Sequence, residues 1–321
     1  MASEILARDH MAYAGSKPWH GLGTALPGIA TAAEMIEAAR LDWEVELIPL
    51  VAMRNGVTIP TNSFSVTRKD CDESLGVVGN RYAPIQNKSQ FSFFDNIVDK
   101  GQAIYHTAGS LFNGKKVWVL AKLPEDMIIW RTDNVKDVTQ KYILLSNTHD
   151  GSGALKIYFT PIRVVCNNTL TASAGTATNK VSIRHTVSAE DKLAEAHKLM
   201  GFTTHFYEEM QKQQQYLANS AINEMKDFYD FLQEIWPDTT AEKSRAQKTR
   251  DAATSFFVEE AETYGADWLS AVNAVTGLID HGTRALPEGK EELRADKILF
   301  GSGALLKERA FEVAMKFAER N

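Results

Sequence analysis

The segment NTHDGSGALKIYFTPIRVVCNNTL, residues 147–170, decides which fold the chain can adopt. Within it, apolar side chains alternate with Lys156, Tyr158 and Thr160. Successive side chains of a strand point to opposite faces of a sheet. The alternation therefore predicts a strand over residues 154–160 with one buried face and one cationic, hydrogen-bonding face. Pro161, which has no amide hydrogen to donate, is expected to end the pairing of this strand.

The same period of two continues on both sides of this segment. Residues 140–148 predict the preceding strand, which the five-residue connection 149–153 joins to the first, and residues 180–186 predict a further strand. Upstream, Asn113-Gly114 is the strongest two-residue hairpin signal in the chain, and it predicts a tight turn before a strand that starts near Lys116. An antiparallel sheet is therefore expected around the opening segment.

The N-terminal third adds shorter elements to this sheet. Residues 1–30 are rich in Gly, Pro and aromatic residues, which predicts an irregular arm. Thr31 and Glu34 have the spacing of a capping box and predict a helix that runs to about Leu41. Strands and one further helix are then expected, in chain order, at residues 45–53, 64–68 and 75–82 and at residues 88–99.

The period changes from two to about 3.6 at Ser188 and stays there, which predicts helices to the end of the chain. About five are expected: one after Ser188; one with the stripe Ile222, Met225, Tyr229, Leu232 and Ile235, ended by Pro237; and three more over residues 239–265, 268–279 and 306–317. The predicted fold class is α+β: an antiparallel β-sheet with packed helices, followed by a helical C-terminal region. The expected domains are residues 1–187, with the N-terminal arm, and residues 188–321.

Composition narrows the class of protein. With 321 residues, 44% hydrophobic and 24% charged, the chain has the composition of a soluble globular protein. No apolar run approaches the roughly 20 residues of a membrane span, and the N-terminus lacks the features of a secretory signal, so a cytoplasmic location is expected. Two cysteines are too few for a disulfide framework, and no two histidines have H-x-x-x-H spacing. No metal or cofactor site is predicted.

Charge is unevenly divided along the chain. Residues 101–185 carry 10 Lys and Arg against 5 Asp and Glu, whereas the whole chain has a net charge of -6. A basic middle third suggests a local anionic partner, although lysines and arginines that merely solvate exposed strands would produce the same pattern. Single-stranded nucleic acid needs cations for its phosphates and flat side chains for its bases. The candidate nucleic-acid-binding residues are Lys116, Trp118, Lys122, Lys141, Lys156, Tyr158, Arg163, Lys180 and Arg184.

Two segments match enzyme motifs only in part. Gly109 to Lys115 fits G-x-x-x-x-G-K, but Lys116 occupies the position where a P-loop needs Ser or Thr, and the following residues have a strand pattern. Residues 149–153 contain Asp150 and Ser152 between glycines but form no G-x-S-x-G elbow, and an Asp beside Gly in a strand connection is typically a turn former. No catalytic residue is predicted.

Several segments resemble one known family, the phage- and plasmid-borne proteins that carry domain of unknown function 932. The matching segments are Trp19-His20-Gly21-Leu22-Gly23, Arg81-Tyr82-Ala83-Pro84, residues 108–109 with 114–119, residues 147–152, residues 160–170 and Gly301-Ser302-Gly303-Ala304. The resemblance spans most of the chain. It implies a mobile-element gene in a bacterial host and carries over no assigned reaction.

The order of elements also resembles, at the level of topology alone, the core of the single-strand annealing proteins of the RecT, Red-beta and Erf kind. That likeness implies binding and annealing of single-stranded DNA in replication or recombination, and a homo-oligomeric ring or filament as the working form. A host or phage replication protein is a further expected partner. Two alternatives stay open: a nucleotide-binding enzyme that uses the Gly-rich turns, and a host-interaction protein that acts through the acidic helices, since residues 186–321 carry 16 Lys and Arg against 24 Asp and Glu.

Overall fold

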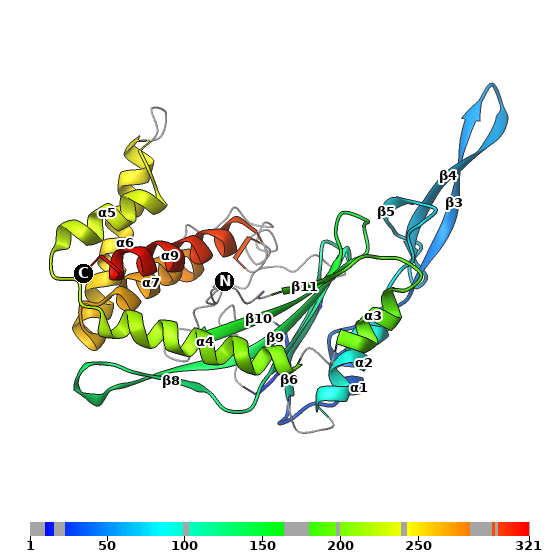
Figure 1. The fold of residues 1–321 in the computed structure, drawn as a ribbon. Coiled ribbons are helices and arrows are strands. Elements are labelled where there is room, and N and C mark those ends of the chain that lie inside the picture. The colour runs from blue at the N-terminus through cyan, green and yellow to red at the C-terminus, as the bar shows by residue number, and fades with distance from the viewer. Residues whose placement is uncertain are drawn as a thin grey trace. The chain divides into compact units, whose positions relative to one another are not determined.

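The computed structural model describes residues 10–15, 23–98, 103–163, 180–196, 200–238, 243–282, 297–298 and 301–320 (Figure 1). The chain forms two compact units. The first comprises residues 1–124, 142–159 and 180–201, and the second comprises residues 125–141, 160–179 and 202–321. The predicted α+β class is confirmed. The boundary expected at residue 188 differs from this division, because residues 125–141 belong to the mainly helical second unit.

The larger sheet has eight strands in the order β11-β10-β9-β7-β6-β1-β2, and β8 pairs with the start of β9. Most pairs are antiparallel, as expected, but β1 and β2 run parallel. The strands are β1 Met11–Ala14, β2 Thr24–Leu26, β6 Ile104–Leu111, β7 Lys116–Lys122, β8 Met127–Trp130, β9 Lys136–Thr148, β10 Leu155–Arg163 and β11 Lys180–Ile183. The irregular arm expected over residues 1–30 is therefore wrong where β1 and β2 join the sheet, because these strands are too short to show a period of two.

Two turns that the sequence predicted lie where they were expected. Phe112, Asn113 and Gly114 have positive φ angles of 59°, 59° and 91° and connect β6 to β7, so the hairpin prediction is confirmed. Residues 149–153 connect the neighbouring strands β9 and β10. The expected end of pairing at Pro161 is wrong, since β10 continues to Arg163. Proline has a φ that suits an extended strand and lacks only one donated hydrogen bond.

A smaller sheet in the first unit has the strand order β3-β4-β5. β3 Val45–Arg54 and β4 Val57–Arg68 form a long two-stranded ribbon whose tip is Asn55-Gly56, and β5 Ser74–Gly79 pairs only with residues 63–67 of β4. The sequence predicted β4 only from Phe64 onward. Its first half is exposed, with Pro60 and Asn62 interrupting the apolar pattern, so the pattern of a half-buried strand is missing there. In Figure 1 the β3–β4 ribbon extends well beyond β5.

Helices of the first unit pack against the larger sheet. In α1, Ala32–Ala38, the capping box is confirmed: Thr31 Oγ1 accepts from the Glu34 amide at 3.3 Å, and the Glu34 carboxylate accepts from the Thr31 amide at 2.8 Å. α2, Asn87–Val98, lies against β7 and buries Phe91 and Phe94. α3, Ala189–Ala196, begins directly after Ser188, and α3 contacts β11.

The second unit is built mainly of α4 Met200–Asn219, α5 Met225–Ile235, α6 Lys243–Tyr264, α7 Trp268–Gly277 and α9 Ser302–Ala318, with the π-helical turn η3 Leu278–Gly282 and the 3-10 turn η1 Thr132–Asn134. Gly265 ends α6 and Pro237 follows α5, as predicted. The start expected for α6 at residues 239–242 lies outside the described residues. The predicted stripe of α5 is wrong in part: Met225 and Tyr229 are 43% and 52% exposed, and Phe228 and Phe231 are buried instead. Both spacings are helical, so periodicity alone does not choose between them.

The core of the second unit combines aromatic stacking with buried charge. Phe228 stacks on Phe257 with ring centroids 4.0 Å apart, and Phe231 meets Trp268 edge-on. Lys307 of α9 donates from Nζ to Asp280 Oδ1 at 2.9 Å, and both side chains are buried. Burial lowers the pKa of Lys307, while Asp280 acts in the opposite direction. An ion pair this deep places α9 relative to η3, because removing one partner would leave the other charge buried alone.

Candidate nucleic-acid interface

The β10–β11 pair carries several of the candidate cations. Its register pairs Lys156 with Ser182 and Tyr158 with Lys180, so these four residues share one face. Lys156 and Tyr158 are partly exposed, whereas Leu155, 0% exposed, and Ile183, 4% exposed, point into the core. One pleated pair of strands therefore carries core and candidate site on opposite faces, as the sequence predicted. We call Lys156, Tyr158, Lys180, Ser182 and Arg184 the β10–β11 surface.

Two members of the candidate set, Lys180 and Arg163, are placed by their backbone alone. Arg184 follows the end of β11 directly and is exposed. Lys180 pairs with Tyr158, but its side chain and that of Arg163 lie outside the described part of the structure. Since β11 is an edge strand, the surface lies at one margin of the sheet and not in its middle. Lysine at a sheet edge also discourages pairing with another strand, which is a purely structural role for the same residue.

The residues of β7 form a second group with different properties. Lys116, Trp118 and Lys122 alternate with the buried residues Val117, Val119 and Ala121 and so share a face. They pair with Thr148, Ser146 and Tyr142 of β9. Lys116 and Lys122 are partly buried. The Trp118 ring is only 8% exposed and lies so close to Gly109 that a Cβ there would be 2.5 Å from it. As placed, Trp118 has no open ring face for a base.

Lys141 does not join either group. It precedes Tyr142, the partner of Lys122, so alternation along β9 directs it to the opposite face. Its Nζ lies 5.9 Å from the centroid of the Tyr207 ring, a cation–π contact within the second unit. The nine sequence candidates therefore separate into the β10–β11 surface, the β7 group, Lys141 and the undescribed side chain of Arg163.

Sequence reasoning missed a buried polar cluster beside the β9–β10 connection. His149 is fully buried, and its Nε2 lies 2.9 Å from Asn87 Oδ1. The Asn87 amide nitrogen donates to the carbonyl oxygens of Leu41 and Trp43, each at 3.2 Å, and the Trp43 ring meets His149 edge-on at 5.4 Å. The cluster thus ties α2 and the entry to β3 to the end of β9. The sequence pattern placed His149 in a strand connection, and nothing local indicates Asn87 or Trp43 as its neighbours.

A second ring pair extends this cluster. Tyr82 stacks on His185 with centroids 4.7 Å apart, and its hydroxyl donates to the Thr148 carbonyl at 3.5 Å. Burial lowers the pKa of His149 to about 3, with smaller contributions from His185 and Arg68, and burial lowers the pKa of His185 to about 4. Burial, and then Asp150, raises the pKa of Tyr82. Neutral rings at these positions are structural parts of the packing around the connection.

Arg68 fixes the base of the ribbon to the β6–β7 turn. It binds Asp70 through Nε at 3.0 Å and Nη2 at 2.6 Å, donates from Nη1 to the Asn113 carbonyl, and lies over the Trp43 ring at 4.2 Å. The hydrogen bond from Arg68 lowers the pKa of Asp70. Gly114 sits against the same indole, where a Cβ would approach Trp43 to 2.9 Å. The space beside this Gly-rich turn is therefore filled by the side chains of Trp43 and Arg68.

The geometry does not complete an enzyme motif. Lys116 opens a strand, whereas a P-loop would need a helix N-terminus at this position. Within residues 10–15, 23–98, 103–163, 180–196 and the later described segments, no three His, Cys, Asp or Glu side chains are placed to hold a metal ion. Among the described helices, none has the length and apolar character that crossing a membrane requires.

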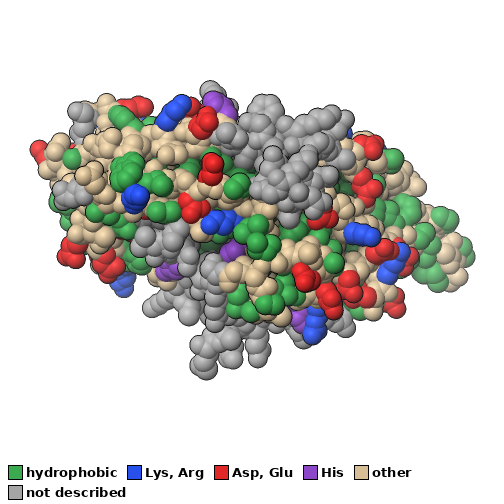
Figure 2. Space-filling model, turned by 90° about the horizontal axis from the view of Figure 1, so that it is seen from below, with side chains coloured by type: hydrophobic (Ala, Val, Ile, Leu, Met, Phe, Trp, Pro, Cys, Tyr) green, Lys and Arg blue, Asp and Glu red, His purple; other side chains and the backbone are tan. Residues whose placement is uncertain are grey.

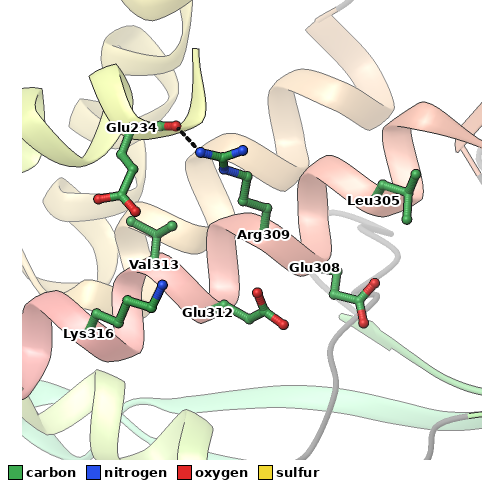
Figure 3. Close-up of a pocket in the computed structure, with 7 residues that line it drawn as sticks. All are labelled: Glu234, Leu305, Glu308, Arg309, Glu312, Val313 and Lys316. Atoms are coloured by element: carbon green, nitrogen blue, oxygen red, sulfur yellow. Dashed lines mark hydrogen bonds between the residues drawn. The ribbon is translucent and has the colours of Figure 1, made fainter. Parts of the chain in front are cut away.

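The second unit has a shallow surface hollow between α5 and α9. Glu234, Leu305, Glu308, Arg309, Glu312, Val313 and Lys316 line it (Figure 3). Arg309 donates from Nη2 to the Glu234 carbonyl at 2.8 Å, drawn as a dashed line in the figure. Acidic and basic side chains alternate around the hollow, so it offers no field of one sign to a charged ligand.

The fold and the candidate surface define the class: an α+β protein with a largely antiparallel sheet and a cationic sheet margin. The family model described as Domain of unknown function (DUF932) matches residues 74–299, which is more than half of the chain. The protein belongs to this family. No curated protein and no solved structure has significant similarity to the chain, so the topological likeness to single-strand annealing proteins gains no support from solved structures.

The lowered pKa values of the two histidines predict how stability changes with pH. In the unfolded chain both rings titrate near 6.5, whereas in the folded chain they stay neutral down to about 4 and about 3. Below pH 6.5 only the unfolded chain gains these protons, so stability is full above that pH and falls as the pH falls. His185→Phe, which keeps the ring stack on Tyr82, should reduce the loss between pH 7 and 5 by up to about 2 kcal/mol.

Thermal melting followed at pH 7, 6 and 5 measures this effect above the range in which most carboxylates titrate. His205→Phe, which replaces an exposed histidine by the same residue, provides the matched control for the substitution itself. Equal pH dependence in wild type and His185→Phe would contradict the assignment.

Proposed function

We propose that this protein binds single-stranded DNA and promotes its annealing during replication or recombination of a mobile genetic element. The observation that carries the proposal is the β10–β11 surface, where Lys156 and the aromatic ring of Tyr158 share one partly exposed face. Cations spaced along a strand match the phosphates of an extended strand of DNA, and a ring between them offers a stacking position for a base.

The distribution of charge supports the same location. Residues 101–185 are the only net-basic third of the chain, and both β10 and β11 lie within it. The β7 group takes a smaller part in this proposal, because Trp118 is buried and both lysines of that strand are partly covered. The working form in this proposal is a homo-oligomer on DNA, with a host or phage replication protein as a further partner.

The salt dependence of binding distinguishes phosphate contacts from the general charge of the protein. If Lys156 and Arg184 both contact phosphate, replacing both by Ala should make the slope of log K against log salt shallower by up to about 1.4, since each neutralised phosphate contributes about 0.7 for single strands. Titration of a fluorescent oligonucleotide at several salt concentrations measures the slope. Lys212→Ala with Lys226→Ala removes the same charge from exposed positions of the second unit and should leave the slope unchanged. No oligonucleotide binding by the wild type at low salt would refute the proposal.

Substitution of Tyr158 tests whether a base stacks on its ring. Tyr158→Ala should weaken binding by about 1–3 kcal/mol while the salt slope stays nearly constant, because a base stack involves no counterion release. Tyr158→Phe keeps the ring and should bind as the wild type does. Tyr229→Ala, at a 52% exposed position of α5, is the matched control for loss of a surface tyrosine. Equal affinity of Tyr158→Ala and the wild type for the oligonucleotide would show that Tyr158 does not belong to the binding site.

A further inference from the structure

In the described part of the first unit, no third strand pairs with the distal half of the β3–β4 ribbon. Residues 51–62 are all exposed, and β5 covers β4 only from Ser63 onward. An isolated two-stranded ribbon is marginally stable in water. In Figure 2 the ribbon, at the right of the view, shows mainly hydrophobic (green) and uncharged (tan) side chains. We call residues 48–62 the arm.

Exposed apolar side chains concentrate on the arm. Of the sixteen large hydrophobic residues that are exposed in the described part of the chain, five belong to it: Ile48 41%, Val51 53%, Met53 68%, Val57 62% and Ile59 43%. Scattered single residues of this kind are ordinary on protein surfaces, but a cluster marks an interaction site. No comparable run of neighbouring residues occurs among the other eleven.

The register assigns these residues to two faces of different character. Val51 pairs with Pro60 and Met53 with Thr58, so one face is uncharged, and Thr58 donates to the Met53 sulfur at 3.4 Å. Ala52 pairs with Ile59 and Arg54 with Val57, so the other face carries the arm's single charge. The face of Val51, Met53 and Pro60 is therefore the one suited to dry contact.

The charge pattern decides between classes of occupant. Residues 47–67 contain one charged residue, Arg54, although 24% of the whole chain is charged. Nucleic acid and anionic lipid both need clustered cations, and a strongly charged protein would need opposite charges, so the arm complements none of them. A neutral apolar surface fits it, and the arm of a second copy is such a surface.

We propose that the arm binds the arm of a second copy of this chain, face to face, through Val51, Met53 and Pro60. This goes beyond the proposed DNA binding and does not depend on it. A two-fold arrangement is self-complementary, and with antiparallel arms it places the two Arg54 side chains at opposite ends of the contact. Pro49 and Pro60 lack amide hydrogens, which disfavours joining of the arms edge to edge and favours packing through side chains.

The size of the arm sets the expected strength. About seven residues per strand at about 3.4 Å each give a contact about 24 Å long. One face of a single ribbon then buries less than the roughly 800 Å² per partner of a standard interface. The proposal is therefore a reversible, concentration-dependent dimer. The arm lies outside residues 74–299, the part of the chain that the family model matches.

Sedimentation velocity of the full chain without DNA, from low micromolar to several hundred micromolar, tests the proposal. The wild type should show a sedimentation coefficient that rises with concentration, and Val51→Glu with Met53→Glu should abolish the rise. Val57→Glu with Ile59→Glu, on the opposite face of the same arm, is the matched control and should associate as the wild type does. All four positions are exposed, so thermal melting should be unchanged.

A charge-complementation experiment identifies the second copy as the occupant. Mixing the Val51→Glu and Met53→Glu chain with a Val51→Lys and Met53→Lys chain should restore association that neither chain shows alone. A wild type that stays monomeric throughout, a glutamate variant that still associates, or a mixture that stays monomeric would each overturn the proposal. Because DNA is absent, none of these outcomes bears on the oligonucleotide titration.

Discussion

The hydrogen bond between His149 and Asn87 is the interaction on which the arrangement of the first unit most depends. It joins the end of β9 to the start of α2, and Asn87 extends it to the carbonyl groups of Leu41 and Trp43. Three segments that lie far apart in the sequence therefore meet at one buried, neutral histidine. Because β10 follows this point within six residues, the cluster also fixes where the β10–β11 surface begins.

Local patterns predicted much of this fold. The capping box at Thr31, the turn at Asn113-Gly114 and the alternation along β10 each depend on neighbouring residues, so the sequence contained the information and the structure agrees. The failures involve distant contacts. The burial of Trp118 depends on the approach of Gly109 from β6, and the buried stripe of α5 depends on Phe257 and Trp268. No pattern within one segment reveals such neighbours.

The candidate site shows the same contrast between what local patterns predict and what distant contacts decide. Alternation correctly grouped Lys156 with Tyr158, but it could not show that Lys141 and Trp118 would be engaged elsewhere. The first unit thus presents two surfaces of contrasting chemistry, a cationic sheet margin at β10–β11 and a largely apolar arm of β3–β4 whose single charge is Arg54. Phosphate contacts weaken with added salt, whereas apolar contacts do not, so the two surfaces respond differently to the same solution conditions.

Ultraviolet crosslinking of an oligothymidylate to the protein, followed by peptide mapping, tests the central claim most directly. The account predicts that the crosslinked peptide contains residues 155–163, with Tyr158 as the modified residue, and that excess unlabelled single strand removes the product. Crosslinks confined to the helices of the second unit, or to the arm, would contradict the assignment of the β10–β11 surface as the DNA-binding site.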